Sequence, residues 1–408
     1  MIINQLVPKT VEVNLINFFI SHRKDFPIKV FDPIVVEFAN DFSKAILRNL
    51  IINRNPAFVA LAYWLRRSNI NRIISENESY TNNNNIHLSP LGVVLHICPS
   101  NVDTMFIYSL FISLLTGNKN IVRLSTRSQD PSLTELFKIF TELLLLDKYN
   151  ILSGYITIFT YERNSVINEE LSKEADGRII WGGDTTVKTF KSIVVNPRSK
   201  DIVFSDRTSL ALINTSKYNQ LNSKDRKQIA KLFFNDAYTF DQKGCSSPQI
   251  IITIGSLEDK IQFEKSFYVD IEQLVSKNYI YDPSSLASLK MNQLALDAID
   301  DNISSYYGPN KNLVFATKSS NNLTETCGGG YFYLVNITDL NELNNYTHKK
   351  VQTISYYGIS EEDKVKILKI SSGRGVERLV PIGEALTFDY IWDGYNLIEE
   401  LIVKKSVR

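Results

Sequence analysis

Residues 90–125 read PLGVVLHICPSNVDTMFIYSLFISLLTGNKNIVRLS, and the apolar pattern of this segment indicates the fold class. Leu91–Cys98 is a continuous apolar run, typical of a strand that is buried on both faces. Met105–Thr116 reads as a buried helix closed by Gly117, and Asn120–Ser125 reads as a second strand. A strand, a helix and a second strand in succession predict a crossover unit in a parallel sheet.

The same alternation continues along the chain. Helical segments separate three further short strands, expected at Ile156–Phe159, Arg178–Trp181 and Ile202–Phe204. One helix is expected to open at Asp130 and Pro131, with the aspartate as N-cap. Parallel sheets of this kind bind nucleotides at the carboxyl ends of their strands, so the pattern predicts a Rossmann-type dinucleotide-binding domain.

The second half of the chain predicts another α/β domain. An amphipathic helix is expected at Ser223–Tyr238, then a turn, a strand at Gln249–Ile254 and a long helix from Ser256. Before the polar run at 80–85, apolar spacing predicts helices. The expected regions are an N-terminal helical region at 1–85, a dinucleotide-binding domain at 86–215, a catalytic domain at 216–395 and a C-terminal tail at 396–408.

Composition excludes several classes of protein. The chain has 408 residues, of which 44% are hydrophobic and 22% charged, and a net charge of +1, as in a soluble globular protein. It shows no basic stripe for nucleic acid and no apolar run of the roughly 20 residues that a membrane span needs, and from its first residues we expect no secretion signal. Its three cysteines form no CxxC pair and meet no histidine cluster, so we expect no metal site and reduced thiols in the cytoplasm.

Three motifs can carry chemistry, and each also has a purely structural interpretation. Cys245, in Gly244-Cys245-Ser246-Ser247-Pro248, is either an exposed nucleophile or a packed turn residue. Asn101 follows the first sheet strand, where it is either an oxyanion donor or a helix N-cap. Gly182, Gly183 and Asp184 are either a turn that admits a pyrophosphate or a plain turn.

Further residues have either a binding role or a packing role in the expected fold. Arg123, Ser125, Thr126 and Arg127 end a strand and either cradle a phosphate or form a solvated loop. Cys98 and His96 are expected to be packed inside the sheet, and Cys327 is expected in a loop.

Taken in order, these motifs resemble the aldehyde dehydrogenase superfamily, and residues 90–125 are similar to its cofactor-domain signature. Within it, the chain resembles the bioluminescence-type long-chain acyl-CoA or acyl-protein thioester reductases. The resemblance covers roughly residues 88–395. It is carried by HICPSN around Asn101, IIWGGD around Gly183, FSDRTSLALI from Phe204, DQKGCSSPQ around Cys245, VQTIS at 351–355 and GVERLVPIGEAL near the end.

The resemblance implies roles for individual residues. Cys245 stands at the position of the family's nucleophile, and Asn101 matches the side chain that forms the oxyanion hole with the Cys245 backbone N–H. Gly182, Gly183 and Asp184 match the turn that receives the cofactor pyrophosphate, and Arg123 replaces a lysine that holds the adenosine ribose.

Two departures from acid-forming aldehyde dehydrogenases indicate the direction of the reaction. Phe204 stands, in an ungapped match, where those enzymes carry the glutamate that activates water, so hydrolysis of an acyl-enzyme should be slow. Thr126, followed by Arg127, stands where NAD-dependent members carry a ribose-binding glutamate. This exchange favours a 2′-phosphate, hence NADPH, with NADH as the alternative donor.

The resemblance therefore implies an NADPH-dependent reductase that converts an acyl thioester to an aldehyde through S-acyl Cys245. The expected partner is an acyl-CoA, an acyl-carrier protein or an acyl-synthetase protein, and the expected assembly is a homo-oligomer. Two alternatives stay open. One is release of a carrier-bound acyl chain in a biosynthetic pathway, and the other is a non-catalytic scaffold subunit, against which the presence of both Cys245 and Asn101 argues.

Overall fold

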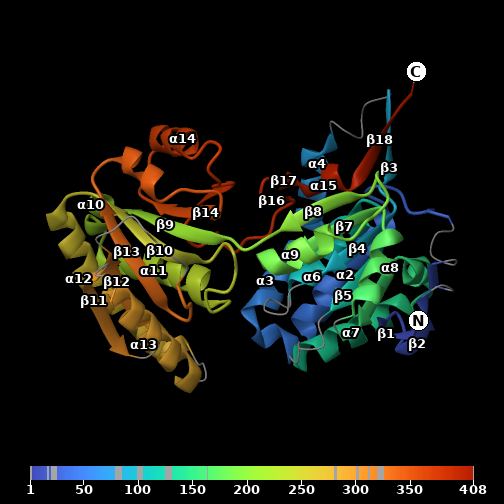
Figure 1. The fold of residues 1–408 in the computed structure, drawn as a ribbon, viewed down its shortest axis with the longest axis horizontal. Coiled ribbons are helices and arrows are strands. Elements are labelled where there is room, and N and C mark those ends of the chain that lie inside the picture. The colour runs from blue at the N-terminus through green and yellow to red at the C-terminus, as the bar shows by residue number, and fades with distance from the viewer. Residues whose placement is uncertain are drawn as a thin grey trace. The chain divides into compact units, whose positions relative to one another are not determined.

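The computed structural model describes residues 2–15, 18–19, 25–78, 85–98, 104–124, 131–162, 164–279, 283–299, 303–310, 313–318 and 326–407. The chain divides into two compact units (Figure 1). The first unit contains residues 1–206 and 388–408, and the second contains residues 207–387. Each unit has its own sheet and its own core, and together they form the predicted α/β fold.

Among the described residues, the first unit contains a seven-stranded sheet. Its order is β2 (Val11–Asn14), β1 (Ile2–Val7), β6 (Ile156–Thr160), β5 (Lys119–Leu124), β4 (Val93–Ile97), β7 (Gly177–Trp181) and β8 (Lys200–Phe204). The five strands from β6 to β8 are parallel, whereas β1 pairs with β6 and β2 in antiparallel fashion. The predicted parallel sheet is therefore confirmed.

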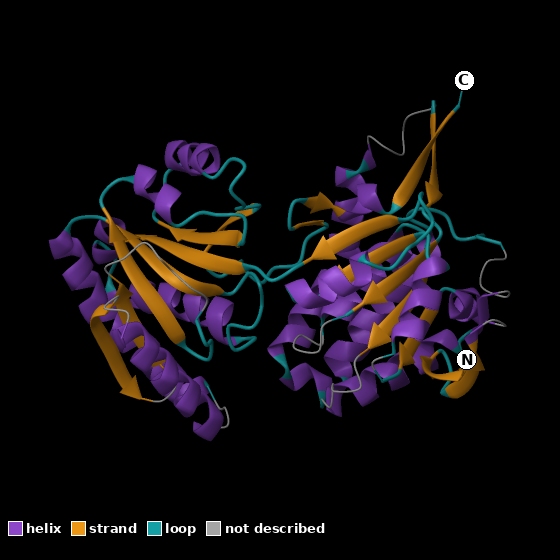
Figure 2. Ribbon diagram, viewed as in Figure 1, coloured by secondary structure: helices purple, strands orange, loops and turns teal. Residues whose placement is uncertain are grey.

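The first unit also contains helices, some of which pack against this sheet and others against one another (Figure 2). They include α2 (Pro33–Arg48), α3 (Pro56–Trp64), α4 (Arg67–Glu76), α6 (Met105–Leu115), α7 (Pro131–Leu144), α8 (Ser165–Lys173) and α9 (Asp184–Lys191). Every residue of α6 is buried, which explains why its sequence is apolar on all sides. His96, on β4, is fully buried between Ser109 Oγ at 2.7 Å and Asn120 Oδ1 at 3.0 Å, as its expected packing role requires.

The prediction of a helical region at residues 1–85 is wrong for the first residues, which are not helical. Residues 2–14 form β1 and β2, because β1 pairs with β6 of the parallel sheet. Ile3, Gln5 and Val7 alternate inward and are all buried, which is the period of a strand. The predicted helices after residue 33 are present as α2, α3 and α4.

The prediction of a C-terminal tail at 396–408 is also wrong. The chain returns to the first unit at Phe388 and forms β16 (Ile391–Trp392), β17 (Tyr395–Asn396), α15 (Leu397–Glu400) and β18 (Ile402–Ser406). β18 lies beside β3 (Ile86–Pro90) as an antiparallel ribbon (Figure 1). Leu397, Ile398 and Leu401 are buried, so this segment belongs to the core of the unit.

The second unit has a seven-stranded sheet of its own. Its order is β11 (Ile303–Asn310), β12 (Leu313–Lys318), β13 (Tyr331–Ile337), β10 (Pro248–Ile254), β9 (Thr208–Asn214), β14 (Val351–Tyr357) and β15 (Arg378–Pro381). All its neighbours are parallel except β11 and β12. Because β9 pairs with β10 and β14, the chain divides after Asp206 and not at the predicted boundary between residues 215 and 216.

Alternate side chains of these strands fill two apolar cores. Ala211 and Ile213 face the core that contains residues of α11 (Ser223–Tyr238) and α12 (Leu257–Asn278), whereas Leu210 and Leu212 face the core on the other side of the sheet. The second core includes residues of η3 (Leu340–Asn345) and α14 (Glu361–Ile370). The helix predicted at Ser223–Tyr238 has these bounds in the structure, and the helix predicted from Ser256 begins with that serine as its N-cap.

Candidate active site

Cys245 lies in the turn between α11 and β10 of the second unit. Ser247 N–H donates to the Gly244 carbonyl at 2.9 Å, and Ser209 Oγ, from β9, donates to the Cys245 carbonyl at 2.7 Å. Cys245 is half-buried and forms no disulfide. Its predicted position between a helix and a strand is confirmed, whereas its role as the nucleophile stays a prediction.

The side chain of Gln242 ties this turn to the neighbouring strand. It is buried, and its Nε2 donates to the carbonyls of Pro248 and Tyr331 at 3.2 Å each. Its Oε1 accepts from Gly330 N–H at 2.6 Å. These bonds fix the turn between the beginnings of β10 and β13. Sequence reasoning did not single out Gln242, because this partner lies 88 residues further along the chain.

The segment from Thr326 to Gly330 borders the same turn. Gly329 N–H donates to the Asp241 carbonyl, and Thr326 N–H donates to Gln249 Oε1, each at 3.1 Å. The run of three glycines after Cys327 was the available sequence signal for this close approach.

The other two cysteines are poor candidates for the nucleophile. Cys98, just after β4, is buried as predicted, and burial raises the pKa of its thiol far above the usual range. Burial also raises the pKa of Cys327 to about 11, although nearby Lys290 acts in the opposite direction. Because the thiolate is the reactive form, neither thiol is poised to react near neutral pH.

The turn from Gly182 to Asp184 joins β7 to α9 in the first unit. A Cβ on Gly183 would lie 3.0 Å from Asp206 Oδ2, so the chain approaches this carboxylate more closely than a larger residue readily allows. The same oxygen accepts from Asp184 N–H at 3.2 Å. The amino terminus of α9, where a pyrophosphate was predicted, thus already contacts a carboxylate. The pyrophosphate contacts of Gly182, Gly183 and Asp184 stay predictions.

Arg123 lies near the carboxyl end of β5. Its guanidinium carbon is 5.4 Å from the ring centroid of Tyr161, and its Nε is buried with no hydrogen-bond partner among the described residues. A buried donor without an acceptor is costly, so this atom fits a ligand that supplies an oxygen. Burial raises the pKa of Tyr161 above its usual range, and the tyrosine is therefore a neutral neighbour of this arginine.

Four predicted site residues, Asn101, Ser125, Thr126 and Arg127, lie outside the described residues. Phe204, the position assigned to the missing glutamate, ends β8 and is buried. Its ring stacks on Trp181 with 3.7 Å between centroids and lies edge-on to Tyr395 at 5.7 Å. An aromatic stack offers no group that can activate water.

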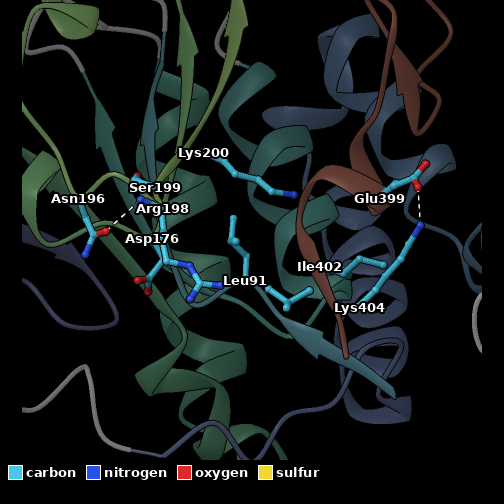
Figure 3. Close-up of a pocket in the computed structure, with 10 residues that line it drawn as sticks. Leu91, Asp176, Asn196, Arg198, Ser199, Lys200, Glu399, Ile402 and Lys404 are labelled. Atoms are coloured by element: carbon cyan, nitrogen blue, oxygen red, sulfur yellow. Dashed lines mark hydrogen bonds and ion pairs between the residues drawn. The ribbon is translucent and has the colours of Figure 1, made fainter. Parts of the chain in front are cut away.

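A cavity of about 580 Å³ lies at the amino ends of strands β7 and β8 in the first unit (Figure 3). It is lined by Leu91, Asp176, Asn196, Arg198, Ser199, Lys200, Glu399, Ile402, Val403 and Lys404. None of the predicted site residues is among them. Lys404 pairs with Glu399, Lys200 Nζ donates to the Glu400 carbonyl at 3.1 Å, and Asp176 accepts from Val93 N–H at 2.8 Å. We therefore do not assign the chemistry to this cavity.

Two searches of the described residues bear on the class of site. Nowhere in them do three or more His, Cys, Asp or Glu side chains gather in a way that could hold a metal ion. Among the same residues, no helix combines the length and the apolar character that crossing a membrane requires.

Comparison with solved structures defines the class of fold. The aldehyde dehydrogenase KauB from Pseudomonas aeruginosa aligns over 100% of this chain and 92% of its own, with a TM-score of 0.68 and 10% identity. The NADP-dependent glyceraldehyde-3-phosphate dehydrogenase from Bacillus halodurans aligns over 100% and 94%, with a TM-score of 0.64 and 14% identity. The protein has an aldehyde dehydrogenase-like fold.

A family comparison is more specific. The family model described as acyl-CoA reductase (LuxC) matches residues 58–404, and the chain belongs to this family. The long-chain acyl-protein thioester reductase 2 of Photobacterium leiognathi is 24% identical over 311 residues, which are 72% of this chain and 59% of the relative. That of Photorhabdus luminescens is 22% identical over 318 residues, 76% of this chain and 61% of the relative. The chain thus spans about three fifths of the length of these relatives.

Proposed function

We propose that this protein reduces an acyl thioester to an aldehyde, with Cys245 as the nucleophile and NADPH as the hydride donor. The observation that carries the proposal is the turn of Cys245, which lies between α11 and β10 beside small residues in a chain of the acyl-CoA reductase family. Cys98 and Cys327, with raised pKa values, leave Cys245 as the thiol best suited to the reaction.

In the proposed cycle, the Cys245 thiolate attacks the thioester carbonyl and forms a new carbon–sulfur bond. The original carbon–sulfur bond then breaks, and the leaving thiolate departs and takes up a proton. Asn101, on the basis of the family resemblance, stabilises the oxyanion of the tetrahedral intermediate. Loss of one such donor typically lowers kcat roughly 10²–10³-fold.

A nicotinamide cofactor, when bound, would supply the hydride that reduces the acyl carbon of S-acyl Cys245. The resulting thiohemiacetal on Cys245 collapses, which releases the aldehyde and restores the thiolate. Phe204 supports this outcome over hydrolysis, because its stacked ring has no acid–base group to activate water.

The described residues fit a phosphate-bearing cofactor at one point. Arg123 Nε, buried and without a partner among the described residues, would donate to the adenosine end. The preference for NADPH over NADH rests on Thr126 and Arg127 in the sequence.

The acyl group is proposed to arrive on CoA or on a protein thiol. The second source is favoured by the names of the relatives, which are long-chain acyl-protein thioester reductases. A homo-oligomer stays part of the proposal.

The test uses purified protein with NADPH or NADH and two substrate series, acyl-CoAs and acylated carrier protein, with cofactor absorbance and aldehyde both measured. We expect aldehyde from at least one series and none from Cys245→Ala. Activity that survives Cys245→Ala would refute the nucleophile. Failure of both series, together with failure to bind either cofactor, would favour the scaffold alternative.

A further inference from the structure

A second loop of the second unit lies against the Cys245 turn. This loop, residues 382–387, follows β15 and has the sequence Ile-Gly-Glu-Ala-Leu-Thr. A Cβ on Gly244, next to Cys245, would lie 3.6 Å from Leu386 Cδ2, which is van der Waals contact. Leu386 is therefore a near neighbour of the backbone beside Cys245.

Asp236, on α11, accepts hydrogen bonds from two backbone amides of this loop. Its Oδ2 accepts from Gly383 N–H at 2.7 Å and its Oδ1 accepts from Ala385 N–H at 3.2 Å. Gly383 has a φ of +102°, and a Cβ there would lie 2.7 Å from Leu232 Cδ2 on the same helix. The loop is thus drawn tightly onto α11, the helix that leads into the Cys245 turn.

Arg378, on β15, donates hydrogen bonds to backbone carbonyls of the same loop. Its Nη1 donates to the Ala385 carbonyl at 2.9 Å, and its Nη2 donates to the Thr387 carbonyl at 3.0 Å. The side chains of Asp236 and Arg378, which come from two different elements, therefore bond to backbone amides and backbone carbonyls of one short loop. These four bonds restrict the loop, and those from Arg378 are the stronger because its guanidinium is charged.

The burial of Asp236 indicates more than a structural cap. Only 1% of its surface is exposed, and burial raises the pKa of its carboxyl to about 7, although the two amides and Arg378 act in the opposite direction. A buried carboxylate is an expensive way to hold a loop. An apolar contact would satisfy packing alone, but it would not fix the two amide groups of Gly383 and Ala385.

We propose that Asp236 and Arg378 are positioning residues for the thiol chemistry: they hold Leu386 against Gly244 and so keep the Cys245 turn in its reactive conformation. This inference rests on the proposed function. Neither residue is proposed to touch the substrate.

The experiment compares Asp236→Asn, Arg378→Lys and Leu386→Ala with a control, Asp270→Asn. Asp270, on α12, also has a pKa raised by burial, but it faces Lys227 and Arg226 instead of the loop. The first readout is the rate at which iodoacetamide alkylates each cysteine, followed by peptide mass spectrometry without substrate. The second readout is kcat and KM with the best thioester.

We expect each of the three loop variants to alkylate several-fold more slowly at Cys245, because the turn leaves its reactive conformation, with Cys98 and Cys327 unchanged. We expect kcat to fall roughly 10- to 100-fold with little change in KM, because small misplacements of reacting groups have effects of this size. The Asp270→Asn control should match the wild type in both readouts.

Unchanged alkylation of Cys245 in all three folded variants would overturn the proposal. Equal acceleration at all three cysteines would also overturn it, because that pattern reports general loosening and not positioning. If Asp236→Asn fails to fold, Leu386→Ala still tests the contact without disturbing the buried carboxylate. If the wild type reduces no thioester, the proposed function fails, while the alkylation rates still decide whether the loop controls Cys245.

Discussion

The carboxylate of Asp206 accepts a hydrogen bond from the backbone N–H of Asp184 at the first turn of α9, with 3.2 Å between Oδ2 and N. The amino terminus of a helix carries a partial positive charge and is a common phosphate site. In this protein that charge is already met by an aspartate 22 residues further along the chain. Asp206 therefore competes with any phosphate that binds there.

The first prediction follows from this competition. Asp206→Asn keeps an oxygen acceptor but removes the negative charge, so NADPH should bind more tightly, by about 1 kcal/mol or roughly five-fold in Kd. Titration calorimetry would measure this. Asp225→Asn, the same change in the first turn of α11, should leave Kd unchanged. Weaker binding to Asp206→Asn would contradict the competition and assign the carboxylate a supporting role.

The second prediction concerns Arg123, whose buried Nε has no partner among the described residues. If that donor serves the cofactor, Arg123→Leu should weaken NADPH binding roughly ten-fold or more, because hydrogen bonds to charged groups contribute about 1.5–3 kcal/mol. Arg198→Leu, at the cavity of Figure 3, serves as the control. Equal affinities in wild type and Arg123→Leu would show that the cofactor does not use this arginine.

The third prediction separates packing from chemistry at Phe204. Phe204→Ala removes a buried ring that stacks on Trp181, and we expect the free energy of unfolding to fall by about 3–5 kcal/mol. Chemical denaturation would measure this loss. The folded fraction should still give aldehyde and no carboxylic acid, since alanine also lacks a base. Acid as the main product would mean that the ring itself excludes water from the acyl-enzyme.

The fourth prediction concerns His96 and acid. Burial lowers the pKa of His96 from 6.5 to about 4, although Asn120 acts in the opposite direction. As the pH falls, this histidine is protonated at a higher pH in the unfolded chain than in the folded protein. The stability that neutral His96 contributes is therefore lost as the pH falls from 6.5 toward 4. The loss should be on the order of 2 kcal/mol between pH 7 and pH 5.

Denaturation curves at the two pH values would test this in wild type and in His96→Asn, where the pH-dependent loss should be smaller. His87→Asn, at an exposed position on β3, should retain the full loss. The same pH dependence in all three proteins would exclude His96 as its source.

The fifth prediction concerns Asp236, whose contribution to stability falls as the pH rises, in contrast to that of His96. Burial raises its pKa from 3.8 to about 7, against the lowering effect of two backbone amides and Arg378, while Glu384 adds to the increase. Its contribution is therefore full below pH 4 and is lost as the pH rises through 7, by a few kcal/mol at most. Hydrogen exchange of α11 between pH 5 and pH 8 should show this loss in wild type. A loss of equal size in Asp236→Asn would exclude this carboxyl as the cause.

Local sequence signals predicted the elements whose pattern is self-contained. Ser223–Tyr238 has a capping asparagine and a helical pattern, and the run at residues 91–98 contains β4. β1 was missed because the alternation of Ile3, Gln5 and Val7 gains its meaning from β6, which lies about 150 residues later. The same reasoning applies to β18, whose partner β3 lies more than 300 residues earlier in the chain.

The candidate site shows the same limit. The small residues around Cys245 and the glycines before α9 could be predicted, because a turn demands particular residue types. The contacts of Asp206 with Asp184 and of Asp236 with Gly383 could not be predicted, since they join residues 22 and 147 positions apart. Electrostatic neighbours of this kind are set by the tertiary fold alone.

The return of the chain to the first unit has a consequence for biosynthesis. All seven strands of the first unit's main sheet are synthesised before the second unit. The partner strand of β3, which is β18, and the stacking partner of Tyr108, which is Phe388, are synthesised only after the whole second unit. The second unit is one uninterrupted segment, residues 207–387, and can fold first. A nascent chain that stalls before Phe388 therefore leaves Tyr108 on α6 without this stacking partner and leaves an edge of β3 unpaired, which favours aggregation.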